Sequence, residues 1–476
     1  MEESITEFDR LRSRNWQNRS VSLLPELLVH IFVSVLRNCG TTSTHKFGVT
    51  NMEMLRRARL SLAAVCTRWR DVVISNQVLW TVIMIRQGRH GFARDLFLEE
   101  LDRSGNSLLS LLVTTPSLVS RFADSRTKDS SAALISAAQL ALPRCKIITI
   151  HTHQTLAAQL LNCISDVPLP NLQSLSVITD PSNSMSIQPI SVDLTASPGL
   201  RELRLDLLDI NFPGHLTISP NTALRCLEAS QSVVSEDIVD ILALSHSLEE
   251  ITWVVLNSVA LQPIERLLPS MLCLRRLVLH GKIPLSMLNH FHAPQLVVLE
   301  MIYQGLNKFK IPTPALPPLK SVHFPDLRVV YIDGYRRMIR NHEASIANFL
   351  AAHSTLQFVS LSEHITEPLA EALCALPSLA HVSARNDQEI STHPLPLIRQ
   401  WYTKATANPR WKPPTLHLPG VYLPDLWYSE ELSKEPALCR FAQQVVLHKQ
   451  VFKQQEDVPY WDTLLATLAS RISAGT

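Results

Sequence analysis

Two pairs of histidines have the spacing of metal ligands. His151 and His153, like His290 and His292, are two residues apart, so the two rings of a pair share one face of an extended strand. A zinc site in a protein needs further ligands, and no cysteine stands at a spacing that zinc sites use. We therefore expect no metal ion to be bound.

No motif of phosphate binding or nucleophilic catalysis is present. The twelve glycines are so dispersed that the closest pair is Gly88 and Gly91, which excludes the glycine-rich phosphate loops and the nucleophile elbow. The eight cysteines include no C-x-x-C pair, which excludes a zinc ribbon or a dense disulfide framework. The sequence predicts a protein that is not an enzyme and that has no cofactor.

The composition predicts a folded protein with a large core. The 476 residues allow two to four domains or one long repeat array, and 46% of them are hydrophobic. A net charge of +2 argues against a nucleic-acid or membrane-binding role. No apolar leader and no apolar run of membrane-spanning length is visible. We expect an intracellular protein, in the cytoplasm or nucleus or both.

Helix-forming periodicity dominates the first eighty residues. Pro25 and Glu26 suit a helix start, Gly40 suits its end, and a T-x-x-E capping box at Thr50 opens a second helix. The apolar stripe of the first helix is Leu24, Leu27, Leu28, Ile31, Phe32, Val35 and Leu36, and that of the second is Leu62, Val65, Cys66, Trp69 and Val72 or Val73. These helices form either a cap on the following region or a docking module for a partner.

This region resembles the F-box. Residues 23–32 read Leu-Leu-Pro-Glu-Leu-Leu-Val-His-Ile-Phe, residues 62–70 read Leu-Ala-Ala-Val-Cys-Thr-Arg-Trp-Arg, and Leu79-Trp80 follows. The three blocks stand in the family's order. Leu24 replaces the proline of many members, and an insertion at about 37–57 lengthens the gap between the first two blocks.

The resemblance implies binding to the Skp-type adaptor of a cullin-RING ubiquitin ligase, and through it to the cullin scaffold. The surface facing the adaptor would then consist largely of Pro25, Glu26, Leu27, Leu28, Ile31 and Phe32. Val65, Cys66, Trp69 and Trp80 would hold the module together and contribute to its edge.

A Leu-x-x-Leu-x-Leu pattern recurs from residue 105 to residue 395. Its copies, which carry apolar substitutions, begin at Leu108, Cys145, Leu172, Leu200, Leu224, Leu248, Leu274, Leu296, Leu327, Leu356 and Leu379. Several intervening segments have helical periodicity, namely 236–244, 342–351 and 368–376. The pattern resembles irregular leucine-rich repeats and predicts a solenoid with parallel strands on its concave face. A generic α/β domain is the alternative.

The concave face would hold the side chains between the buried leucines. Its candidates for binding a protein substrate are Arg201, Arg204, Arg225, Glu228, Glu250 and Arg276. The alternative is that these charged residues form an ordinary solvated surface. From about residue 391 the sequence is rich in proline and aromatic residues, which predicts a terminal cap, with amphipathic helices at 432–451 and 461–472.

The sequence thus predicts an α/β protein in four parts. These are a polar segment 1–20, an F-box-like helical module 21–90, a leucine-rich-repeat solenoid 91–395 and a cap 396–476. The predicted function is a substrate-recognition adaptor of a Skp-cullin-F-box-type ubiquitin ligase. The alternative is a leucine-rich-repeat scaffold or ligand-binding protein outside ubiquitin chemistry.

Overall fold

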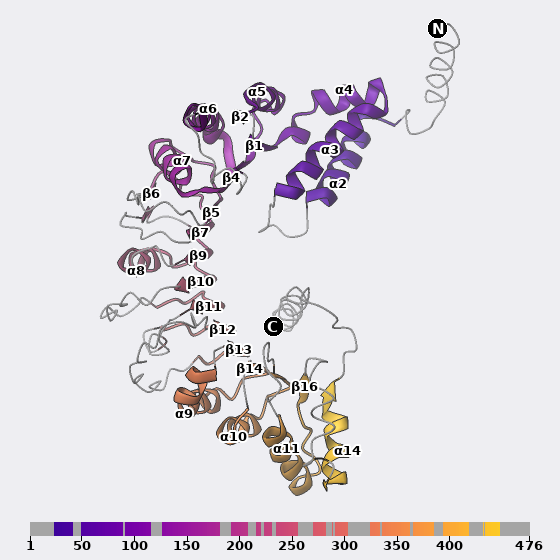
Figure 1. Ribbon diagram of the computed structural model, residues 1–476, viewed down its shortest axis with the longest axis vertical. Coiled ribbons are helices and arrows are strands. Elements are labelled where there is room, and N and C mark those ends of the chain that lie inside the picture. The colour runs from indigo at the N-terminus through magenta and orange to yellow at the C-terminus, as the bar shows by residue number, and fades with distance from the viewer. Residues whose placement is uncertain are drawn as a thin grey trace. The chain divides into compact units, whose positions relative to one another are not determined.

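The chain folds into helices and strands that belong to two compact units (Figure 1). The first unit comprises residues 1–223 with 232–237, and the second comprises 224–231 with 238–476. The computed structural model describes residues 23–40, 49–88, 91–115, 126–180, 192–207, 216–219, 223–230, 235–255, 270–281, 288, 291–302, 324–333, 336–361, 365–384, 394–417, 432 and 434–447.

The first unit begins with a helical module. Its elements are α2 (Pro25–Gly40), α3 (Val49–Val65), α4 (Thr67–Ser75) and the 3-10 turn η2 (Gln77–Trp80). Pro25 takes the first helical position of α2, where its missing N–H costs nothing, and Glu26 lies in the first turn. The start at Pro25 and the end at Gly40 confirm the predicted first helix.

The second helix was predicted to be continuous, and this prediction is wrong. It is divided at Cys66 into α3 and α4. The backbone of Cys66 is extended, with φ −160° and ψ 170°, and its Sγ accepts a hydrogen bond from the Trp69 N–H at 3.5 Å. Cys66 is therefore the N-cap of α4 and not a residue on the stripe of one long helix. Thr50 lies inside α3 and is not its cap, since α3 starts at Val49.

The region predicted as an insertion is mostly helical. The last turn of α2 and the first half of α3 occupy most of residues 37–57, and only residues 41–48 between them lie outside the described part. Of the predicted insertion, residues 37–40 and 49–57 are therefore helical.

A sheet follows the helical module in the first unit. Its strands are β2 (Gly91–Phe92), β1 (Val82–Gly88), β3 (Leu109–Thr114), β4 (Cys145–His153), β5 (Ser174–Asp180) and β7 (Glu202–Leu207), in that order across the sheet. All pairings are parallel except that of β1 with β2. The helices are α5 (Arg94–Arg103), α6 (Arg126–Ala141) and α7 (Gln154–Asp166), and β6 (Val192–Leu194) pairs separately with β8 (Leu216–Ile218).

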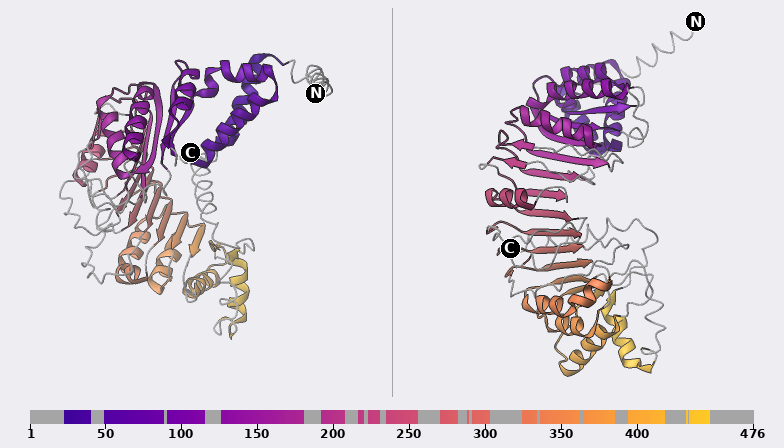
Figure 2. Two further views of the ribbon diagram at one scale, coloured as in Figure 1. Left: turned by 45° about the horizontal axis from the view of Figure 1, so that its top comes forward. Right: turned by 60° about the vertical axis from the view of Figure 1, so that its left-hand side comes forward.

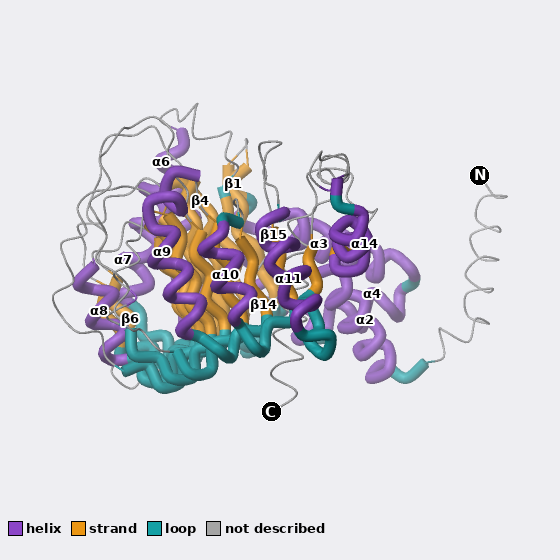
Figure 3. Tube along the Cα trace, turned by 90° about the horizontal axis from the view of Figure 1, so that it is seen from below, coloured by secondary structure: helices purple, strands orange, loops and turns teal. Residues whose placement is uncertain are grey.

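The second unit is a longer parallel sheet with strands in chain order (Figure 2). The strands are β9 (Cys226–Ser230), β10 (Glu250–Val255), β11 (Arg276–Gly281), β12 (Val298–Ile302), β13 (Val329–Asp333), β14 (Phe358–Leu361), β15 (His381–Ala384), β16 (Thr415–His417) and β17 (Val446–Leu447). The helices are α8 (Ser235–Leu244), α9 (Arg336–Ala352), α10 (Glu367–Ala375), α11 (Leu395–Ala407) and α14 (Pro436–Val445). Figure 3 shows α9, α10 and α11 along one face of the strands.

The three helices predicted between strands are confirmed as α8, α9 and α10. Every predicted copy of the repeat pattern also coincides with a strand. The second and third apolar positions of neighbouring copies pair in register, so that Ile251 pairs with Leu277 and Leu299 pairs with Val330. The chain is therefore an α/β protein built on a long parallel sheet, an arrangement consistent with a leucine-rich-repeat solenoid.

Seven of the strands, β5, β7 and β10–β14, are preceded by a turn that the sequence pattern did not reveal. The first leucine of a copy donates its N–H to the carbonyl three residues earlier, as from Leu274 to Met271 at 3.2 Å and from Leu327 to Phe324 at 3.1 Å. Residues at this earlier position are buried, including Leu169, Ser197, Ser245, Met271, Ala293, Phe324 and His353. The turn thus places one more side chain of each of these seven repeats in the core.

Strands and helices continue beyond residue 395, where a cap was expected. α11, β16, α14 and β17 extend the second unit, and Trp401 on α11 is fully buried. The helix predicted at 432–451 is shorter, because Val446 and Leu447 pair with Leu416 and His417 as a strand. The helix predicted at 461–472 lies outside the described residues. None of the described helices is long and apolar enough to cross a membrane.

Candidate partner-binding surfaces

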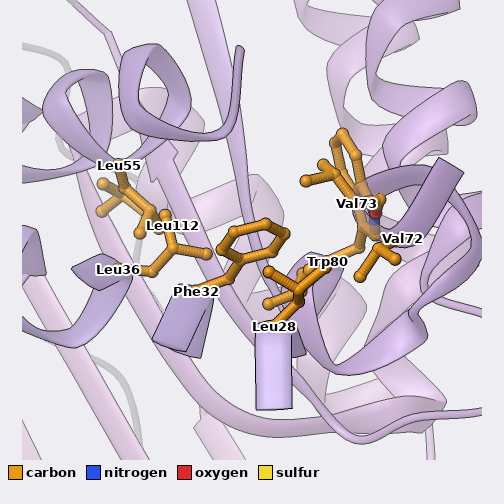
Figure 4. Close-up of a cluster of buried hydrophobic side chains, with 9 residues drawn as sticks. Leu28, Phe32, Leu36, Leu55, Val72, Val73, Trp80 and Leu112 are labelled. Atoms are coloured by element: carbon orange, nitrogen blue, oxygen red, sulfur yellow. The ribbon is translucent and has the colours of Figure 1, made fainter. Parts of the chain in front are cut away.

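Helix α2 carries two apolar stripes side by side. Leu28, Phe32 and Leu36 are at most 7% exposed and form the core of the helical module with Leu55, Val72, Val73, Leu79, Trp80 and Leu112 (Figure 4). The neighbouring stripe is exposed: Leu24 by 63%, Leu27 by 48%, Ile31 by 44% and Val35 by 38%. We call these four residues the α2 stripe. A contiguous exposed apolar surface of this kind is typical of an interaction site.

The predicted adaptor-binding residues are therefore divided between the core and the surface. Pro25, Glu26, Leu27 and Ile31 are exposed, as docking requires. Leu28 and Phe32 are fully buried, so the prediction that they face a partner is wrong. Their spacing places them on the flank of the helix that packs against α3 and α4.

The residues of the second and third sequence blocks mostly stabilise the module. The ring of Trp69 packs against Phe32 with centroids 4.9 Å apart, and the buried Trp80 donates its indole N–H to the Val73 carbonyl at 2.7 Å. Cys66 caps α4. Val65 is half exposed and so adds to the surface.

A buried charge cluster joins the helical module to the strands of the first unit. The Trp80 ring lies near two guanidinium groups, with Arg59 5.2 Å and Arg103 4.7 Å from its centroid. Arg59 is 4% exposed and donates from Nη2 to the Val82 carbonyl at 2.8 Å. Glu100 on α5 is 5% exposed, and its Oε1 lies 3.4 Å from Nε of Arg56.

Burial changes the proton affinity of this cluster. Desolvation lowers the pKa of Arg59 to about 10, although the charge of Glu100 opposes that change. Desolvation also raises the pKa of Glu100, while the charges of Arg56, Arg59 and Arg103 lower it. The opposite charges of the arginines and Glu100 offset the cost of burying them. Through these contacts the cluster connects α3 to α5 and β1.

The candidate substrate-binding residues are placed on both units. Arg201 and Arg204 belong to the first unit, where Arg204 Nη2 lies 3.9 Å from Asp206 Oδ2. The other four, Arg225, Glu228, Glu250 and Arg276, belong to the second unit.

Two of these arginines are paired with acidic residues of the neighbouring repeat. Arg225 Nη1 lies 3.7 Å from Glu249 Oε1, and Arg276 Nη2 lies 2.8 Å from Glu300 Oε1. Glu250 is exposed and Glu228 is half-buried. The charges of this surface therefore largely neutralise one another within the chain, as on an ordinary solvated face.

The face of the sheet away from the helices changes character along the second unit. In β10 the side chains that alternate with the buried Ile251 and Trp253 are exposed (Glu250) or half-buried (Thr252 and Val254). In β12, β13 and β14 both sets of side chains are buried instead. The buried apolar residues of this face are Val278 of β11 (5% exposed), Val298 of β12 (8%), Val329 and Tyr331 of β13 (1% and 8%) and Phe358 of β14 (2%), which we call the apolar patch.

The apolar patch was missed in the sequence, although a signal was present. Strands with one solvated face alternate apolar and polar residues, as β7 does with Glu-Leu-Arg-Leu-Asp-Leu. Strands covered on both faces read as almost continuous apolar runs, as β12 does with Val-Leu-Glu-Met-Ile. The contrast between the two kinds of strand separates the solvated part of this face from the covered part.

A polar group borders the apolar patch on β14, β15 and β16. The rings of His381 and His417 lie with Nδ1 and Nε2 3.3 Å apart, and burial lowers the pKa of His381. Ser360 and Ser383, paired in register, are buried at 1% and 0% exposure, with no hydrogen-bond partner for either hydroxyl.

Metal-ligand geometry is not found in the described part of the chain. No group of three or more His, Cys, Asp or Glu residues there could hold an ion. His153 instead acts as the N-cap of α7, since its Nδ1 accepts from the Leu156 N–H at 3.5 Å. His290 lies outside the described residues.

Comparison with known proteins gives no relative for these surfaces: no family model matches the chain, and no curated protein is significantly similar to it.

Proposed function

We propose that the chain is a substrate-recognition adaptor of a Skp-cullin-F-box-type ubiquitin ligase. In this proposal the helical module docks on the Skp-type adaptor, and leucine-rich repeats present a sheet face to a protein substrate. The chain itself catalyses nothing and works by raising the local concentration of the substrate near the ubiquitin-loaded enzyme. Such a role would be performed in the cytoplasm or nucleus.

The α2 stripe is the observation that carries this proposal. Its four residues are exposed beside a complete hydrophobic core, so the module does not need them for its own packing. Three of them, Leu24, Leu27 and Ile31, also lie in the sequence block, residues 23–32, on which the F-box resemblance rests. An apolar anchor surface on a helix is a common means of peptide and protein docking.

A direct binding measurement with a purified Skp-type adaptor–cullin complex tests the proposal. The full chain is expected to bind the complex, and the double variant Leu27→Asp with Ile31→Asp is expected to bind at least about tenfold more weakly, since a buried unpaired charge would oppose docking. Leu60→Asp is the matched control, because Leu60 on α3 is 62% exposed and lies outside the α2 stripe.

Equal binding by the double variant and the control would contradict the proposal. Both variants are expected to keep the thermal stability of the wild type, since their side chains are exposed. A loss of stability confined to the double variant would mean that α2 packs inward on both sides.

A non-catalytic leucine-rich-repeat scaffold is the second candidate. The observation that favours it is the continuity of the module core with the sheet: Leu112 of β3 belongs to that core, and Val82 and Met84 of β1 pack against it. The helices therefore also act as an end cap for the sheet. Absence of adaptor binding by a stable full chain would favour this candidate.

A further inference from the structure

We draw no further inference here: the strongest candidate, the side-chain cluster of Ser360, Ser383, His381 and His417 on β14, β15 and β16, borders the apolar patch, and nothing in the described part of the chain shows what covers this cluster or which ligand it would take.

Discussion

The guanidinium of Arg276 on β11 reaches the carboxylate of Glu300 on β12, with Nη2 2.8 Å and Nε 3.0 Å from the same Oε1. Glu300 is 6% exposed and lies on the face of the sheet away from the helices. The pair thus marks the border between the solvated part of this face and the part that is covered. Arg276 is engaged by its own chain and is poorly placed to recruit a substrate.

Arg276→Ala tests this pair. The change leaves the buried carboxylate of Glu300 without its partner, so the free energy of unfolding should fall by about 1–3 kcal/mol. The double variant Arg276→Ala with Glu300→Gln should recover part of the loss, because no buried charge remains. Urea denaturation measures both. An equal loss in the single and double variants would show that the ion pair does not set the effect.

Arg59→Met tests the attachment of the helical module. Arg59 loses its hydrogen bond to Val82, and Glu100 loses a nearby opposite charge, so stability should fall by about 2–4 kcal/mol. Arg57→Met, at an exposed position on the same helix, should change it by less than about 0.5 kcal/mol. Denaturation followed by tryptophan fluorescence reports the change, and similar values for the two variants would contradict it.

The burial of Glu100 also predicts a dependence of stability on pH. Because burial raises the pKa of this carboxyl, the folded state binds its proton more tightly than the unfolded state. Its contribution to stability therefore falls as pH rises from the ordinary value of 4.5 through the raised value. Glu100→Gln should remove this component from the pH profile of the unfolding free energy. A profile identical to that of the wild type would contradict the assignment.

His381 should make stability depend on pH in the direction opposite to that of Glu100, so that stability falls on acidification. Burial lowers its pKa below the ordinary 6.5, so the folded state favours the neutral ring. The stability that depends on the neutral ring is complete above pH 6.5 and is lost as pH falls through the lowered pKa, with a slope of at most about 1.4 kcal/mol per pH unit. His381→Gln should flatten this slope. His246→Gln, at an exposed position, serves as the control and should leave it unchanged.

His353 should stabilise the contact between two successive repeats through its two hydrogen bonds. Its Nε2 accepts a hydrogen bond from the Phe324 N–H at 3.1 Å, and its Nδ1 lies 2.7 Å from the Phe349 carbonyl as the donor. His353→Ala removes both bonds and opens a cavity, so stability should fall by about 2–4 kcal/mol.

Hydrogen exchange measured on peptides that contain Phe324 gives the local readout of this change. Exchange there should quicken by about tenfold or more in His353→Ala. His292→Ala, at an exposed position, should leave it unchanged. Unaltered exchange at Phe324 in His353→Ala would mean that the ring does not hold the turn.

The strands β3–β5, β7 and β9–β15 of the parallel sheet could be located from the sequence alone. Leucine spacing predicted each of them from Leu108 to Leu379, because a side chain buried on one face of a strand recurs with a period of two and fixes the register of its neighbours. The start of α2 at Pro25 and its end at Gly40 were also predictable, because local backbone chemistry decides helix ends.

The division of α2 into a buried and an exposed stripe was decided by tertiary structure. Leu27 and Leu28 are identical in type and adjacent in sequence, and only the position of α3 and α4 makes one exposed and the other buried. The break at Cys66 is similar, because a residue that fits an apolar stripe instead leaves the helix and caps the next one.

The sequence by itself thus determined the strands of the repeat pattern, the helices α8, α9 and α10, and the ends of α2, because these depend on local periodicity and local backbone chemistry. Contacts between residues far apart in the chain decided the rest: the ion pairs of Arg225 and Arg276, the charge cluster at Arg59 and the burial of Val329 and Phe358. The sequence shows whether a side chain is apolar or charged and how such side chains are spaced. It does not record which neighbour will cover it, since that depends on how the strands and helices pack.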